Sequence, residues 1–190
     1  MNYIKLILLD FDGTLVDTRQ ANGQAYIEAL KQVGIEITYE EYLERFFGVR
    51  CMEFLRMVGI NDEMEIARVR QLKINLYPKY FDSVTLNTPL WEWCQMMRRM
   101  GSQVWIVSTG HRDNIRNVMN HLNITSGIDG IITGDDVANP KPAPDCFLMA
   151  MESVGVSPRE TIIFEDSSVG LQAAEASGAS FVRVNSNISD

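Results

Sequence analysis

The chain has 190 residues, of which 46% are hydrophobic, and a formal net charge of −8 at pH 7. This length and composition indicate a globular protein with one domain of ordinary size, or a core with a smaller appendage. The acidic balance argues against a partner bound through a phosphate backbone and against an anionic membrane surface. A small charged ligand stays compatible with it, because one local cationic site can outweigh the overall sign.

The cysteine pattern and the N-terminal segment bear on the compartment. Cys51, Cys94 and Cys146 are far apart and form no C-x-x-C pair, so neither a disulfide framework nor a zinc knuckle is indicated. Segment 1–9 lacks the length and cleavage site of a signal peptide, and no apolar run approaches membrane-spanning length. We therefore expect a cytoplasmic protein that binds neither nucleic acid nor a membrane. The sequence leaves the oligomeric state open.

The first predicted element is a buried strand at 4–10, which leads into the stretch "LILLDFDGTLVDT". The segment that follows, 17–86, has helical spacing of its apolar residues and no convincing strand. Because the first strand needs parallel neighbours that arrive only later, we expect 17–86 to be an all-helical cap inserted into a core formed by 1–16 and 87–190. Two linkers would join the parts and allow a hinge.

After the insertion, strands and helices alternate. Apolar runs predict further buried strands at 103–107, 130–133, 161–164 and 181–184. Between them, apolar residues recur at i, i+3, i+4 and i+7, the spacing of amphipathic helices. The stripes are Leu90, Trp93, Cys94 and Met97; Ile115, Val118, Met119 and Leu122; and Phe147, Leu148, Met151 and Val154. This alternation predicts an α/β fold, a Rossmann-like parallel sheet with helices on its faces.

Polar residues follow four of the predicted strands. In an open parallel sheet, ligands bind beyond the carboxyl ends of the strands. A serine at such a place is commonly a helix cap and a lysine in a loop is commonly solvated, so each position alone is weak evidence. Together they predict one site, formed by Asp10, Ser108, Thr109, Lys141, Glu165 and Asp166.

The stretch Asp10 to Gly13 admits three interpretations. Aspartate and glycine are common in turns, and D-x-D-G also occurs in calcium loops. An EF-hand loop has its glycine at position six, however, whereas Gly13 would be at position four and follows a strand. The third interpretation makes Asp10 a nucleophilic carboxylate and Asp12 a proton-transfer group.

A carboxylate that attacks an anionic phosphate needs a nearby cation to offset the repulsion. Hard oxygen ligands from Asp10, the main chain at Asp12 and Asp166 suit Mg²⁺, and no His or Cys cluster competes for a softer metal. Lys141 offers a second positive charge between closely spaced prolines, which restrict its backbone. Adjacent acids such as Glu165 and Asp166 repel each other unless a cation or N–H donors compensate.

Ser108 and Thr109 precede a predicted helix that starts near Arg112. Both residues suit a cap of that helix. The Ser108 hydroxyl and nearby main-chain N–H groups also suit phosphate oxygens at a helix N-terminus. The two roles are compatible.

The motifs "DFDGTLVDT", "VSTG", "KPAPD" and "FEDSSVG" resemble, in order and separation, the four motifs of the haloacid dehalogenase superfamily. The whole chain resembles its phosphatase-type members with a small helical cap, the branch of phosphoglycolate phosphatase and β-phosphoglucomutase. The resemblance implies that Asp10 forms an aspartyl-phosphate and that Asp12 protonates the leaving oxygen and then activates water. It also implies that Ser108 and Lys141 hold the phosphoryl group of a small phosphorylated metabolite.

The same resemblance implies Mg²⁺ bound by Asp10, the Asp12 carbonyl and Asp166, with Glu165 just behind these ligands. Dehalogenases and phosphonate-cleaving members lack an acid at the position matching Asp12, so phosphate transfer is favoured. Sugar phosphomutases carry a histidine at the position of Asn22, and its absence weakens the mutase alternative without removing it.

A phosphate-accepting signalling module is an alternative from another class. In such a module the adjacent acidic pair comes first in the chain, whereas here it comes last. In the cap, Arg50 is a candidate substrate contact or a surface charge. His111 either lines the pocket or only starts a helix. Sugar phosphates, phosphoglycolate-like acids and nucleotides remain open as substrates.

Overall fold

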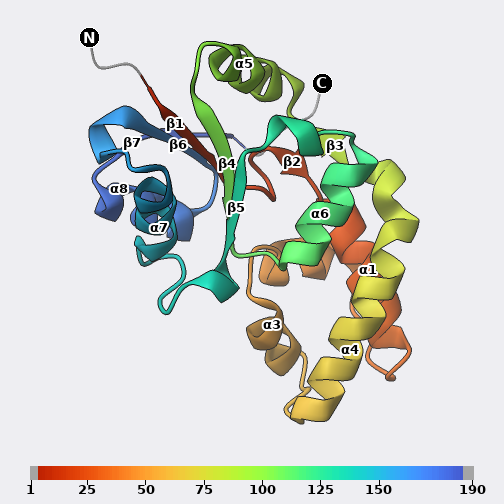
Figure 1. Ribbon diagram of the computed structural model, residues 1–190. Coiled ribbons are helices and arrows are strands. Elements are labelled where there is room, and N and C mark those ends of the chain that lie inside the picture. Colours follow the sequence, from red (N-terminus) through yellow and green to blue (C-terminus); the bar gives the residue numbers. More distant parts are fainter. Residues whose placement is uncertain (1–3, 186–190) are drawn as a thin grey trace. The chain divides into compact units, whose positions relative to one another are not determined.

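Five parallel strands form a sheet in the order β5-β4-β1-β6-β7 in the computed structural model, which describes residues 4–185 (Figure 1). Their bounds are β1 (Leu6–Leu9), β4 (Gln103–Ser108), β5 (Gly130–Thr133), β6 (Thr161–Glu165) and β7 (Ser180–Arg183). In the register, Leu8 lies opposite Trp105 on one side and Ile163 on the other. The predicted α/β class and its parallel sheet are confirmed. Residues 1–3 and 186–190 of the expected core and its N-terminal segment lie outside the described residues.

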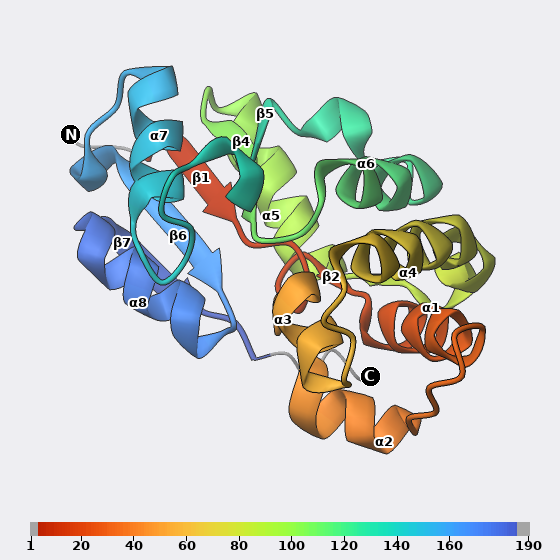
Figure 2. The ribbon, with the colours of Figure 1, turned by 90° about the horizontal axis from the view of Figure 1, so that it is seen from below.

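Helices cover both faces of the sheet, which explains why all four residues of β1 are apolar and buried. Figure 2 shows α7 and α8 on one side of β1 and α5 and α6 on the other. Their bounds are α5 (Thr88–Arg99), α6 (Arg112–His121), α7 (Asp145–Val154) and α8 (Ser168–Ser177). Short 3₁₀ turns η3 (Thr125–Gly127), η4 (Gly134–Asp136) and η5 (Pro158–Glu160) lead into strands or loops.

One predicted helix stripe is wrong in detail. Leu148 is 43% exposed, whereas Ala150 is fully buried in its place. The inward face of α7 consists of Cys146, Phe147, Ala150 and Met151, which pack with β1, β4 and β6 in one apolar cluster. The stripe is therefore shifted by one residue, because the helix buries the side next to Phe147 rather than the side next to Leu148.

The chain divides into two compact units, one of Met1–Asp17 with Leu86–Asp190 and one of Thr18–Thr85. The second unit is helical, with α1 and α4 packed side by side (Figure 2). Its elements are α1 (Arg19–Lys31), α2 (Tyr39–Glu41), the π-turn η1 (Tyr42–Phe46), α3 (Cys51–Met57), α4 (Glu63–Leu76) and the 3₁₀ segment η2 (Tyr77–Ser83). Tyr42, Phe46 and Phe54 fill its own apolar cluster.

Two very short strands flank the helical segment. β2 (Val16–Asp17) and β3 (Thr85–Leu86) pair with each other in a separate two-stranded sheet. The sequence predicted no strand there, because two residues are too few to show a periodic pattern.

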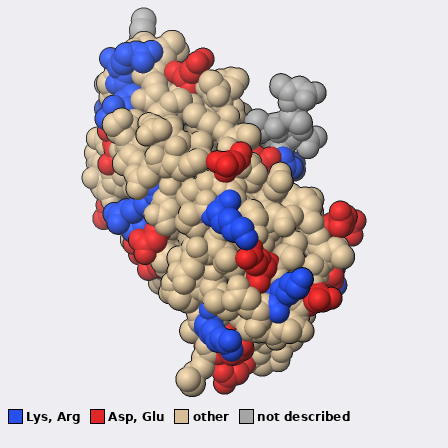
Figure 3. Space-filling model, turned by 90° about the vertical axis from the view of Figure 1, so that its right-hand side faces the viewer, with Lys and Arg blue, Asp and Glu red and all other residues tan. Residues whose placement is uncertain are grey.

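The placement of charged side chains and the apolarity of the helices bear on the charge and membrane expectations. Lys and Arg lie interspersed with Asp and Glu on the face shown in Figure 3, and that face shows no continuous basic patch among the described residues. None of the helices within 4–185 combines the length and apolarity that crossing a bilayer requires.

Candidate active site

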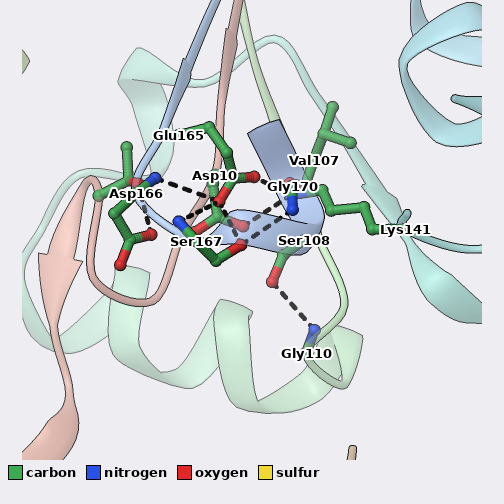
Figure 4. Close-up of polar contacts among 10 residues, drawn as sticks. Asp10, Val107, Ser108, Gly110, Lys141, Glu165, Asp166, Ser167 and Gly170 are labelled. Atoms are coloured by element: carbon green, nitrogen blue, oxygen red, sulfur yellow. Dashed lines mark hydrogen bonds and ion pairs between the residues drawn. The ribbon is translucent and has the colours of Figure 1, made fainter. Parts of the chain in front are cut away.

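A buried lysine connects the carboxyl ends of three neighbouring strands (Figure 4). The Lys141 Nζ donates to Asp10 Oδ1 at 2.7 Å, to Glu165 Oε2 at 2.6 Å and to the Val107 carbonyl at 2.8 Å. These acceptors belong to the ends of β1, β6 and β4, and Lys141 is only 5% exposed. An ammonium has three donors, so all of them are used. The alternative of a solvated loop lysine is therefore wrong.

The charges of this cluster depend on one another. Burial alone lowers the pKa of Lys141, but the Asp10 and Glu165 carboxylates outweigh burial and raise it, so the ammonium stays protonated. Burial raises the pKa of Asp10 well above its ordinary value, Lys141 opposes that rise and Glu165 adds to it. Lys141 thus offsets part of the cost of burying the Asp10 carboxylate.

Glu165 is completely buried and held from several sides. Its Oε1 accepts hydrogen bonds from the Asp166 N–H at 3.2 Å, the Ser167 N–H at 3.1 Å and the Ser167 hydroxyl at 2.9 Å. A Cβ on Gly170 would lie 2.0 Å from this carboxylate, so α8 can approach only because that position is glycine. N–H donors and a lysine therefore compensate the repulsion between the two adjacent acids.

Asp166 lies beside the turn that follows β1. The Thr14 hydroxyl donates to Asp166 Oδ1 at 3.0 Å. Burial raises the pKa of Asp166, and the Thr14 hydrogen bond opposes the rise. A Cβ on Gly13 would lie 2.3 Å from Asp166 Oδ2. The turn therefore approaches this carboxylate as closely as a glycine permits.

The acidic cluster fits a hard divalent cation. Asp10, Glu165 and Asp166 each offer a carboxylate oxygen within 4.8 Å of the others. With Lys141 as the partner cation, the three carboxylates leave two formal negative charges uncompensated. No hydrogen bond from the described residues reaches Asp10 Oδ2 or Asp166 Oδ2. Oxygen donors with excess negative charge are what Mg²⁺ and Ca²⁺ prefer.

Asp12 and Ser108 flank a glycine at the end of β4. A Cβ on Gly110 would lie 3.3 Å from Asp12 Oδ2 and 3.2 Å from Ser108 Oγ. Ser108 is buried, and its Oγ accepts from the Gly110 N–H at 3.0 Å. The N-cap of α6 is His111, whose side chain makes no capping bond. Ser108 is therefore not a helix cap, while Thr109 next to it is exposed.

The remaining sequence candidates are Arg50 and His111. Arg50 belongs to the helical unit and lines a hollow of about 500 Å³ along α3 with Met52, Glu53, Arg56 and Met57. His111 Nδ1 and Asn114 Oδ1, on the first turn of α6, are buried without a hydrogen-bond partner among the described residues. A buried polar atom without a partner is costly, so these two atoms suit a ligand contact.

Sequence reasoning missed three contributors. Thr14 fixes Asp166, Ser167 fixes Glu165, and the Val107 carbonyl takes the third proton of Lys141. Thr14 is a small hydroxyl residue two positions after Asp12 and Ser167 directly follows Asp166, so their closeness to motif acids is a usable sequence signal. The Val107 contact uses a backbone carbonyl, so the residue type gives no indication of it. It can be found only from the course of the loop that carries Lys141.

Comparison with known proteins identifies the chain's relatives. The family model described as haloacid dehalogenase-like hydrolase matches residues 7–184. The chain belongs to this family. It is therefore an enzyme of the hydrolase class, and the resemblance stated from the four motifs is confirmed. A solved haloacid dehalogenase-like hydrolase from Bacteroides fragilis shares the fold, with a TM-score of 0.82 at 26% identity, covering 98% of this chain and 90% of that one.

Individual relatives are distant in sequence but match more than nine tenths of this chain. Fructose-1-phosphate phosphatase YqaB of Escherichia coli (strain K12) is 27% identical over 183 residues, which are 94% of this chain and 95% of that protein. Protein SUPPRESSOR OF QUENCHING 1 of Arabidopsis thaliana is 25% identical over 98% of this chain, but the chain spans only 18% of that protein. CbbY from Rhodobacter sphaeroides, solved in complex with phosphate, matches in fold with a TM-score of 0.84 at 23% identity, covering 98% of this chain and 89% of that one.

Proposed function

We propose that the chain is a Mg²⁺-dependent phosphatase that hydrolyses a small phosphorylated metabolite through an aspartyl-phosphate on Asp10. The observation that supports it best is the buried Lys141 that pairs with Asp10 and Glu165, next to the Asp166 carboxylate of the same acidic cluster. A phosphatase of 27% identity that matches this chain almost end to end supports the same reaction class. In this proposal 1–16 and 87–190 form the catalytic core and 17–86 the cap.

The first half of the reaction uses Asp10 and Asp12. A carboxylate oxygen of Asp10 forms a bond to phosphorus while the bond from phosphorus to the leaving oxygen breaks. The Asp12 carboxyl gives its proton to that oxygen, so the alcohol departs neutral. Asp12 suits this role because its carboxylate lies at the Gly110 turn, next to Ser108 and past the end of β1.

The second half regenerates the enzyme. The Asp12 carboxylate takes a proton from a water molecule, whose oxygen attacks phosphorus. The bond between phosphorus and Asp10 then breaks and inorganic phosphate leaves. The Ser108 hydroxyl and the Thr109 main-chain N–H offer donors to the phosphoryl oxygens near the start of α6.

Lys141 acts mainly through its charge in this proposal. Its three protons are used by Asp10, Glu165 and Val107, so it stabilises the nucleophile and the phosphoryl group as a fixed cation. Glu165 keeps Lys141 in place. Asp10, Asp166 and the Asp12 carbonyl would hold Mg²⁺, which lowers the repulsion between the carboxylate and the phosphate and polarises the phosphoryl group.

The substrate and the compartment are also part of the proposal. Arg50 in the helical unit is the candidate contact to the non-reacting part of a small phosphate ester. A cytoplasmic location agrees with Cys51, Cys94 and Cys146, which are all free thiols.

The test of the proposed function is phosphate release from a panel of substrates. Sugar phosphates, phosphoglycolate and nucleotides are incubated with the purified chain, with and without a chelator. We expect inorganic phosphate to appear in step with substrate loss, to stop on chelation and to return with added Mg²⁺. Absence of phosphate release from every substrate at saturating Mg²⁺ would contradict the proposal, and conversion to an isomeric sugar phosphate would favour a mutase.

Replacing Asp12 with asparagine is expected to lower kcat by about 10²- to 10⁴-fold, the usual range for a general acid and base. Asparagine keeps the shape and the backbone carbonyl but cannot give a proton to the leaving oxygen. The loss should be smaller for p-nitrophenyl phosphate, whose leaving group needs no proton. An equal loss on good and poor leaving groups would argue against Asp12 as the acid.

A further inference from the structure

An arginine and an aspartate connect the loop that follows Ser108, here called the Ser108 loop, with the loop that carries Lys141. Arg112, the first residue of α6, donates through Nη1 to the Ile131 carbonyl of β5 at 3.1 Å and pairs through Nη2 with Asp136. Asp136 Oδ2 also accepts from the Thr133 N–H at 2.6 Å and from the Thr133 hydroxyl at 2.7 Å. We call Arg112, Thr133 and Asp136 the loop latch.

The latch joins the end of the loop after Ser108 to the start of the loop that leads to Lys141. Ser108 and Thr133 are paired neighbours at the ends of β4 and β5. The two loops also touch, since a Cβ on Gly134 would lie 3.8 Å from the Thr109 Cα and 3.6 Å from Pro140 Cβ. The path of the loop after β5 is therefore set in part by its contacts with the residues that follow Ser108.

The path of this loop matters because the loop has to bring Lys141 past the end of β4. The sheet order places β4 between β5 and β1, yet Lys141 reaches Asp10 at the end of β1. Only residues 134–140 separate the end of β5 from this lysine. A change in the path of so short a loop moves the ammonium relative to Asp10, and a displacement of about 1 Å in a catalytic group can cost about 100-fold in rate.

Helix stability alone does not explain Arg112. A cation at the first position of a helix is disfavoured by the helix dipole, so this charge is not placed to stabilise α6. The Asp136 carboxylate compensates it. Burial raises the pKa of Asp136, but the Thr133 hydrogen bonds and Arg112 outweigh burial and hold it below its ordinary value, so Asp136 is ionised at neutral pH.

We propose that Arg112 and Asp136 are positioning residues that fix the Lys141 loop against the Ser108 loop and thereby set the rate of phosphoryl transfer. The inference rests on the proposed function for its effect on rate. Its structural part, that the latch holds residues 134–143 in place, is independent of any activity.

A matched ion pair at the opposite end of the same strands provides the control. Asp129 pairs with Arg98 at 2.7 Å and accepts from the Val104 N–H at 2.9 Å, just as Asp136 pairs with an arginine and accepts a backbone N–H. The two pairs have similar exposure, 38% and 23% against 32% and 31% for Arg112 and Asp136. Asp129, however, lies before β5 rather than after it.

The kinetic experiment compares Asp136→Ala with Asp129→Ala. We expect Asp136→Ala to lower kcat by about 10- to 100-fold with KM changed less than about threefold, and Asp129→Ala to leave kcat within about twofold. Asp136→Glu should recover part of the rate, because a carboxylate is restored. Equal losses in Asp136→Ala and Asp129→Ala would overturn the proposal, since the effect would then be general destabilisation.

Hydrogen–deuterium exchange tests the structural part without a substrate. Peptides that cover 134–143 should exchange about 10-fold faster or more in both Asp136→Ala and Arg112→Ala, and at the wild-type rate in Asp129→Ala. Unchanged exchange in this segment would overturn the proposal even if activity falls. Faster exchange in a chain that releases no phosphate from any substrate would instead reject the proposed function and support the latch.

Discussion

Replacing Asp10 with asparagine is expected to reduce phosphate release by about 10⁴-fold or more while the protein still folds. Asparagine has the shape of aspartate and its Oδ1 still accepts the hydrogen bond that Lys141 Nζ now gives to Asp10 at 2.7 Å. The amide oxygen is a poor nucleophile, so no bond to phosphorus forms. Folding should survive, because Glu165 and the Val107 carbonyl still accept from the buried ammonium.

The covalent intermediate gives this prediction a second measurement. With substrate labelled in the phosphoryl group and an acid quench, wild-type protein should retain label that hydroxylamine releases, as an acyl phosphate does. The Asp10→Asn protein should retain none. Asp82→Asn, a change of an exposed carboxylate in the helical unit, is the control and should retain full activity. Near-normal turnover by purified Asp10→Asn would end the proposal of an aspartyl-phosphate.

The parts of the fold that depend on buried periodicity could be predicted from the sequence. The apolar run before Asp10 became β1, and its four buried residues need no polar face because helices cover both sides of the sheet. The convergence of Asp10, Glu165 and Asp166 followed from the rule that parallel strands end at one edge. Both predictions need only local sequence and a general property of parallel sheets.

The partners of Lys141 could not be predicted in the same way. Prolines around Lys141 indicated a restricted loop, and the resemblance implied a phosphate contact, but neither showed that all three ammonium protons would be taken by protein acceptors. That outcome depends on how the loop after β5 passes β4. The ion pair between Asp136, near the start of this loop, and Arg112 of α6 has no periodic signal in the sequence. Contacts between loops that are far apart in the chain cannot be predicted from local sequence patterns.

Close backbone approaches were missed for a related reason. Gly170 has ordinary helical surroundings in the sequence, yet the Glu165 carboxylate occupies the place of its missing side chain. Only the packing of α8 against the end of β6 makes that glycine necessary. The same holds for Gly13, where the sequence suggested a turn residue and the structure adds a steric requirement.

Replacing Gly13 with alanine is expected to weaken Mg²⁺ binding by 10-fold or more and to lower kcat by about 100-fold. Gly13 has φ +95°, in the left-handed region, and an added Cβ would lie 2.3 Å from Asp166 Oδ2. Asp166 would have to move, and with it the oxygen that we propose as a metal ligand. The Thr14 hydroxyl, which donates to Asp166 Oδ1 at 3.0 Å, would lose its partner as well.

Gly101→Ala separates the steric effect from backbone strain. Gly101 lies in the same compact unit and has φ +103°, but an added Cβ would meet no atom within 4 Å. Both variants should lose about 1–2 kcal/mol of stability, the cost of a left-handed residue with a side chain, and Gly13→Ala should lose more because its Cβ displaces Asp166. Only Gly13→Ala should need more Mg²⁺ for half-maximal activity, and excess Mg²⁺ should restore part of its rate. Equal Mg²⁺ requirements in the two variants would show that Asp166 is not a metal ligand, because the substitution that displaces its carboxylate would then leave metal binding unchanged.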